Sequence, residues 1–167
     1  MHKMISILVR NHPGVLSHVA GLFTRRGYNI ESIAAGETEN PDVTRITIVV
    51  AGDEAILEQV TKQLRKLIDV IKVQDLSYSR SITRELVLLT IYSPVDKRAE
   101  VINTANTFGA TVVDITDKTM TLEFVGDARK VNTIMRALEG FKVKEVARTG
   151  LVGLPLESQI EGSLNML

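Results

Sequence analysis

The sequence has no cysteine and no tryptophan, and aromatic residues make up only 4% of its 167 residues. Without cysteine the chain forms no disulfide, holds no thiolate-bound metal and offers no cysteine nucleophile. The shortage of aromatic side chains also argues against the stacking platform with which RNA-recognition sheets hold bases. Because a cysteine-free chain suits a reducing compartment, we expect the protein to be cytoplasmic.

The sequence also lacks an excess of charge of either sign and any long apolar run. The 20 basic residues balance the 20 acidic ones, giving a net charge of +0. A broad positive surface for nucleic-acid backbones is therefore not expected. No stretch reaches the roughly 18 apolar residues of a membrane span, and the run before Arg10 is too short for a signal peptide. We expect a soluble globular protein with neither a nucleic-acid nor a membrane partner.

Hydrophobic periodicity predicts the order strand, helix, strand, strand, helix, strand in the first half of the chain. Apolar residues recur at helical spacing between Gly14 and Gly27, and Gly27 is a typical left-handed cap. A second helix is expected from the N-cap Asp53 to about Leu67. The strands are expected at residues 4–9, 29–36, 44–50 and 70–76.

The same order recurs in the second half. Strands are expected at 86–92, 111–115 and 119–125, with one helix ending at Gly109 and another starting after Asp127. The last helices superimpose at an offset of 74, as in an internal repeat. The fold class is therefore α+β, with two tandem ferredoxin-like βαββαβ domains, each a four-stranded antiparallel sheet with two helices on one face. The apolar faces predicted for these two helices are Val95, Ala99, Ile102 and Phe108, and Val131, Ile134 and Leu138.

The periodicity lapses around residues 77–81, which sets the domain boundaries. We expect one domain at 1–78, a linker at 79–84, a second domain at 85–149, and an extended or loosely held tail at 150–167. The strand at 4–9 is apolar on both faces, whereas helices cover one face of such a sheet, so self-association is expected. The alternative is that the two repeats of one chain cover each other.

The first strand-to-helix loop is the segment in which the repeats differ most. It contains Asn11-x-x-Gly14 in the first repeat, but Ser93-Pro94-Val95 in the second. A helix beginning at glycine has no side-chain cap, so the N–H groups near Gly14, Val15 and Leu16 could hold a carboxylate. Asn11, and Asn29 at the next strand, would supply polar groups for a zwitterionic amino acid. The alternative is ordinary Pro-Gly turn chemistry with an asparagine that caps the backbone.

No catalytic or metal-binding residue is predicted. The only histidines are His2, His12 and His18, and their spacing does not match a helical metal pair. The sequence contains neither a G-x-S-x-G elbow nor a glycine-rich phosphate loop.

Several blocks carry a resemblance that covers nearly the whole chain. They are Ile5-Ser6-Ile7-Leu8-Val9, Asn11-x-x-Gly14-Val15-Leu16, Val19-x-Gly21-Leu22-Phe23, Arg26-Gly27-Tyr28-Asn29-Ile30-Glu31-Ser32, Gly52-Asp53, Gln63-Leu64-x-Lys66-Leu67, Arg84-Glu85-Leu86 and Glu145-Val146-Ala147-Arg148-Thr149-Gly150. In these blocks the chain resembles the small, regulatory subunit of acetolactate synthase (acetohydroxyacid synthase), an ACT-domain family of branched-chain amino-acid biosynthesis. His18 departs from the pattern, because many relatives have arginine there.

This resemblance implies a non-catalytic subunit with an N-terminal ACT domain and a C-terminal ferredoxin-like domain. It implies a homodimer that binds a branched-chain amino acid, usually valine, between two ACT domains. Asn11, Gly14, Val15 and Leu16 of one chain and Asn29 and Ile30 of its neighbour would form that site. The partner would be a large catalytic subunit, which carries thiamine diphosphate, magnesium and FAD. The small subunit would activate this large subunit and make it sensitive to feedback inhibition.

Two alternatives remain open at this point. A free-standing ACT-type amino-acid sensor would use the same site to control another partner, such as a transcription factor or a transporter. An RNA-binding protein on the same fold is disfavoured by the neutral charge and by the lack of stacking aromatics.

Overall fold

The computed structural model describes residues 2–76 and 81–157, which divide into two compact units. The first unit contains the described residues up to Ile82 and those from Leu151 onward, and the second is Thr83–Gly150. The first unit contains β1 (His2–Arg10), α1 (Val15–Arg26), β2 (Ile30–Glu37), β3 (Val43–Ala51), α2 (Glu54–Leu64) and β4 (Val70–Asp75).

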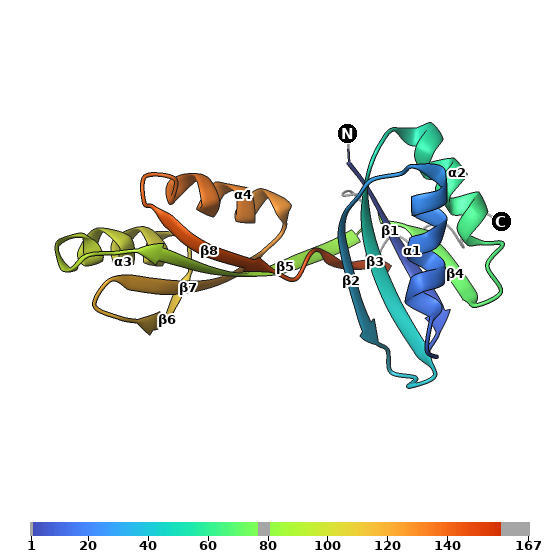
Figure 1. Cartoon of the computed structure of the whole chain (residues 1–167), viewed down its shortest axis with the longest axis horizontal. Coiled ribbons are helices and arrows are strands. Elements are labelled where there is room, and N and C mark those ends of the chain that lie inside the picture. Colours follow the sequence, from blue (N-terminus) through green and yellow to red (C-terminus); the bar gives the residue numbers. More distant parts are fainter. Residues whose placement is uncertain (1, 77–80, 158–167) are drawn as a thin grey trace. The chain divides into compact units, whose positions relative to one another are not determined.

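The strands of the first unit form an antiparallel sheet in the order β2-β3-β1-β4, so β2 and β4 are its edges. Helices α1 and α2 lie side by side against this sheet (Figure 1). Alternate residues of β1, namely Ile5, Ile7 and Val9, are fully buried in the core that both helices share. The predicted βαββαβ order and the ferredoxin-like fold are confirmed.

The other face of this sheet is less open than the periodicity suggests. Met4, Ser6, Thr47 and Val49 alternate with the core positions, yet each is at most 6% exposed. Arg45 donates a hydrogen bond to Ser6 Oγ over 2.7 Å on the same face. The middle of this face is therefore covered, and a further strand could pair with this sheet only at its edge strands, β2 and β4.

The second unit repeats the order. It contains β5 (Ser81–Tyr92), a short 3₁₀ helix η1 (Val95–Lys97), α3 (Arg98–Thr107), β6 (Thr111–Ile115), β7 (Thr119–Gly126), α4 (Ala128–Ala137) and β8 (Val143–Arg148). The sheet order is β6-β7-β5-β8. A further strand, β9 (Val152–Pro155), also pairs with β5, although its residues are grouped with the first unit. Its core is built from alternate positions of β5 and β7 with residues of α3 and α4.

The structure corrects two expectations. Val95 is 73% exposed and Ala99 is exposed, whereas Val101 and Ala105 are buried, because the first turn is 3₁₀ and shifts the apolar face of the helix that follows. Residues 81–84 of the expected linker already belong to β5, while residues 79–80 lie outside the described residues. The tail at 150–167, expected to be extended or loosely held, is extended where it forms strand β9, and its residues from 158 lie outside the described residues.

Equivalent aspartates start the second helix of each repeat, as the offset of 74 predicts. The side chain of Asp53 accepts a hydrogen bond from the Ile56 amide over 3.1 Å, and that of Asp127 accepts one from the Lys130 amide over 2.8 Å. Gly52 precedes the first cap because a Cβ there would lie within 2.9 Å of the Ile56 side chain. The repeat therefore extends to the hydrogen bonds that start these helices.

Removing either cap should cost its own unit a similar amount of stability. We expect Asp53→Ala and Asp127→Ala each to lower the free energy of unfolding by about 1 kcal/mol, because an amide of the first helical turn loses its acceptor. Hydrogen exchange should show the loss at α2 amides in the first variant and at α4 amides in the second. If either variant lowered hydrogen-exchange protection in both units, the expectation that each cap stabilises its own unit would be contradicted.

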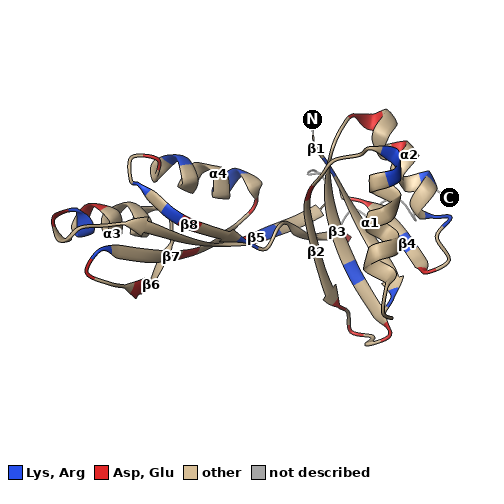
Figure 2. Cartoon of the chain, in the orientation of Figure 1, with Lys and Arg blue, Asp and Glu red and all other residues tan. Residues whose placement is uncertain are grey.

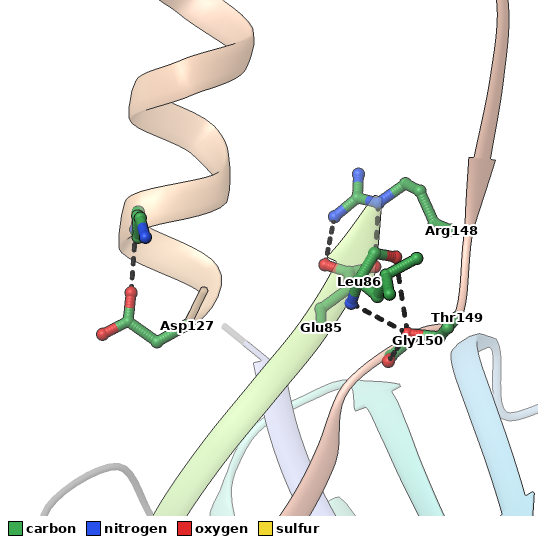
Figure 3. A network of polar contacts seen from close by, with 7 residues as sticks. Glu85, Leu86, Asp127, Arg148, Thr149 and Gly150 are labelled. Carbon is green, nitrogen blue, oxygen red and sulfur yellow. Dashed lines mark hydrogen bonds and ion pairs between the residues drawn. The ribbon is translucent and has the colours of Figure 1, made fainter. Parts of the chain in front are cut away.

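A buried ion pair joins the two ends of the second unit's sequence. Glu85 on β5 has a side chain only 5% exposed, and both of its carboxylate oxygens accept hydrogen bonds from Arg148 on β8, over 2.8 Å and 2.7 Å (Figure 3). The Thr149 hydroxyl accepts a hydrogen bond from the Leu86 amide over 3.1 Å in the same region. This carboxylate raises the pKa of Arg148 by hydrogen bonding.

Candidate functional site

The loop between β1 and α1 has the geometry expected of an anion-binding helix entrance. Gly14 is the N-cap with φ +89°, and no side chain of the described residues caps the helix. The Val15 amide reaches only the His12 carbonyl oxygen, over a long 3.4 Å. Val15 is buried, whereas Leu16 is 45% exposed next to it. A small ligand could therefore meet both free amide hydrogens and an apolar side chain here.

Asn11 has one of its two amide functions already engaged. Its Nδ2 donates to the Pro41 carbonyl oxygen over 2.9 Å and to Glu37 Oε1 over 3.5 Å, and its backbone amide donates to the Asp42 carbonyl oxygen over 2.8 Å. Asn11 thus ties the loop to the β2–β3 hairpin. Its Oδ1 accepts no hydrogen bond from the described residues, so this oxygen can accept one from a ligand.

Asn29 and Ile30 lie at the opposite end of the sheet from this loop. Ile30 pairs with Val50 on β3, whereas Arg10, the residue before the loop, pairs with Val43. The stretch from Val43 to Val50 spans about 23 Å of extended strand. One chain therefore brings together Asn11, Gly14, Val15 and Leu16 but does not bring Asn29 and Ile30 to them.

Asp69 is a neighbour of the loop that the sequence pattern did not reveal. It lies between α2 and β4, 57 positions from His12, yet its carboxylate is 2.7 Å from His12 Nε2 and 3.4 Å from His18 Nδ1. Its backbone oxygen accepts a hydrogen bond from the Arg10 amide over 2.9 Å. No local motif links positions so far apart, and only the sheet order β1-β4 could have suggested the contact.

Both basic and acidic residues occur in each unit (Figure 2). The helices differ in this respect, because α1 and α4 contain Lys or Arg but no Asp or Glu. No cluster of three potential metal ligands occurs within residues 2–76 and 81–157. In the same ranges, no helix is both long and apolar enough to cross a bilayer.

Comparison with known proteins gives matches to both units. Residues 5–72 match the family model for the acetohydroxyacid synthase (AHAS) small subunit-like ACT domain, and residues 84–157 match the model for the small subunit of acetolactate synthase. The chain is 48% identical over 148 residues to a probable acetolactate synthase small subunit of Methanothermobacter thermautotrophicus, covering 88% of each chain. It is 45% identical over 150 residues to the acetolactate synthase small subunit of Mycobacterium bovis, covering 90% of this chain and 89% of the other.

A solved structure supports the same assignment. The crystal structure of the acetolactate synthase small subunit from Thermotoga maritima superimposes with a TM-score of 0.84 at 35% identity, covering 93% of this chain and 98% of that one. The predicted resemblance is therefore confirmed in sequence and in fold. On this evidence of sequence and structure, the chain belongs to the acetolactate synthase small-subunit family.

Proposed function

We propose that this protein is the non-catalytic regulatory subunit of an acetolactate synthase and that it binds a branched-chain amino acid, most favourably valine, at an ACT dimer interface. In this proposal it activates a large catalytic subunit and makes it sensitive to feedback inhibition. Thiamine diphosphate, magnesium and FAD would belong to the large subunit, not to this chain. The observation that carries the proposal is the entrance of α1, which no side chain of the described residues caps, beside Asn11 Oδ1, to which none of those residues donates a hydrogen bond.

Each group of a branched-chain amino acid has a partner at this loop. The carboxylate would accept hydrogen bonds from amides near Gly14 and Val15, where the helix dipole also favours negative charge. The ammonium group would donate to Asn11 Oδ1, since the amide's donor side is already bound to Pro41 and Glu37. The aliphatic side chain would pack on exposed Leu16.

A two-fold dimer through β2 would complete the site. Within the part of the chain that the structure describes, β2 is an edge strand that pairs with β3 alone, and Ile33 lies near its middle. If two β2 strands pair antiparallel with Ile33 on the symmetry axis, Asn29 of the partner subunit lies opposite Glu37. Glu37 is the residue that Asn11 contacts. This pairing therefore brings the two distant halves of the predicted site together.

Calorimetry of the full chain with L-valine, L-leucine and L-isoleucine tests the binding proposal. Asn11→Ala should weaken binding about tenfold, because it removes the acceptor for the ammonium group. Gly14→Asp should abolish measurable binding, because it places a carboxylate where the ligand's own carboxylate would lie. The backbone at Gly14 has φ +89°, and a Cβ at this position would have no atom within 4 Å, so the substitution causes backbone strain but no clash.

The corresponding loop of the second unit supplies the matched control. Val95 is 73% exposed there, so Val95→Asp adds the same charge to the equivalent turn of the other unit and should leave binding unchanged. Wild-type affinity retained in both Asn11→Ala and Gly14→Asp would refute the site.

Affinity purification from the native host, with mass spectrometry of the bound proteins, tests the proposed partner. It should recover the thiamine-diphosphate enzyme. Recovery of a transcription regulator instead would favour a free-standing sensor.

A further inference from the structure

Two of the chain's three histidines converge on one carboxylate beside the α1 entrance. Asp69 has a side chain 12% exposed, and its Oδ1 and Oδ2 face His12 Nε2 and His18 Nδ1 respectively. His12 is 40% exposed and belongs to the loop proposed to bind the effector, between Asn11 and Gly14. The binding contacts proposed above do not use this cluster.

Both ring nitrogens of His12 face acceptors. Nε2 lies 2.7 Å from Asp69 Oδ1, and Nδ1 lies 3.0 Å from the Pro13 carbonyl oxygen. A neutral imidazole has one N–H and can donate to only one of these oxygens, whereas an imidazolium donates to both. The geometry of the loop therefore matches the protonated ring.

We propose that Asp69 is a positioning residue for the effector loop, holding protonated His12 against Pro13, and that loss of the His12 proton weakens the loop's hold on the effector carboxylate. This inference rests on the proposed function, because it concerns regulation of the same site. Asp69 itself would not touch the ligand and acts through His12.

The charges around His12 give the direction of the effect. The hydrogen bond with Asp69 raises the pKa of His12, with a smaller contribution from the Pro13 carbonyl, and it lowers the pKa of Asp69. Arg10 at the end of β1 acts against the rise, and His18 on α1 also faces Asp69. Glu37 on β2 lies on the other side of the loop, against Asn11.

Deprotonation leaves negative charge beside the anion-binding amides. Asp69 stays ionised because its pKa is lowered, so above the pKa of His12 its charge is no longer balanced by the imidazolium. The loop also loses one of the two hydrogen bonds that fix His12 between Pro13 and Asp69. Effector affinity should therefore be high below the raised pKa of His12 and fall as the pH rises through it.

Calorimetry of the full chain with L-valine, from about pH 5.5 to about pH 8.5, tests the inference, because histidine titrates in this range while neither group of valine does. The wild-type affinity should fall about threefold to tenfold, as expected for one unit of charge near a partly exposed site. His12→Gln should bind with an affinity that no longer changes with pH. His18→Gln is the matched control and should keep the pH dependence, because His18 is 64% exposed and lies 3.4 Å from Asp69, farther than the 2.7 Å of His12.

Asp69→Asn adds a test with two readouts, of which the first needs no ligand. It should lower the pKa of His12, read from the NMR titration of the imidazole Cε1 proton, and should move the midpoint of the affinity change to lower pH by the same amount. An unchanged pH dependence in His12→Gln would overturn the inference while leaving the proposed function standing. Absence of binding of L-valine, L-leucine and L-isoleucine at every pH would overturn the proposed function and this inference with it.

Discussion

A single cysteine at position 33 is expected to convert the oxidised protein into a disulfide-linked dimer. The natural chain has no cysteine, so every cross-link would come from the introduced residue. Ile33 is 37% exposed on the edge strand β2, and a two-fold axis at this position would place the two Cα atoms at the separation of directly opposed residues in an antiparallel pair. That separation is compatible with a disulfide. Non-reducing electrophoresis after mild oxidation should show mainly dimer.

The other edge of the same sheet provides the control. Ile71 on β4 is 55% exposed, so Ile71→Cys offers a cysteine of at least equal accessibility on a strand that the proposed dimer does not use. This variant should remain mainly monomeric on the gel. Equal cross-linking of the two variants would indicate random collision, and cross-linking of Ile71→Cys alone would place the interface at β4.

Arg148→Ala should cause a larger loss of stability than the removal of either helix cap. It leaves the Glu85 carboxylate, whose side chain is only 5% exposed, without its two hydrogen bonds. We expect the second unit to lose about 2 to 3 kcal/mol, less than for a fully buried pair because Arg148 is 45% exposed. Hydrogen exchange at β5 and β8 amides would measure this loss in that unit alone.

Two further variants test whether the unpaired Glu85 charge, rather than a loss of packing, causes the loss of stability. Glu85→Met combined with Arg148→Met removes both charges and should recover most of the lost protection, because no unpaired charge stays buried. Lys62→Ala breaks the exposed pair with Glu58 on α2 and should leave the protection of its own unit unchanged. A double variant as unstable as Arg148→Ala would show that packing, rather than the buried charge, accounts for the loss.

Local patterns were sufficient to predict most of the fold. The strands and helices, the left-handed Gly27 and the capping Asp53 and Asp127 all follow from residues within a few positions of each other. The prediction of the first helix face of the second repeat was wrong where Pro94 is followed by a 3₁₀ turn, because helical periodicity assumes one constant turn angle.

The candidate site was predictable only in part. Asn11 and Gly14 stand in one loop, and the comparison between the repeats singled them out. The roles of Asp69 and Glu37 depend on strands that meet only after folding, and a sequence without aligned relatives gives no signal for such distant contacts. Asn11 also shows that the residue type alone does not predict which groups can bind a ligand. Its Nδ2 already donates to the Pro41 carbonyl oxygen, so the proposed contact uses Oδ1.

The order of the strands has a consequence for folding during synthesis. The sheet of the first unit consists of β1 to β4, and the last of these strands ends at Asp75. The ribosome therefore releases every strand of this sheet before β5 and the rest of the second unit, so the N-terminal sheet can form first, as N-terminal domains usually do. Strand β9 pairs with β5 and emerges last, so it adds to a strand that is already part of a formed sheet.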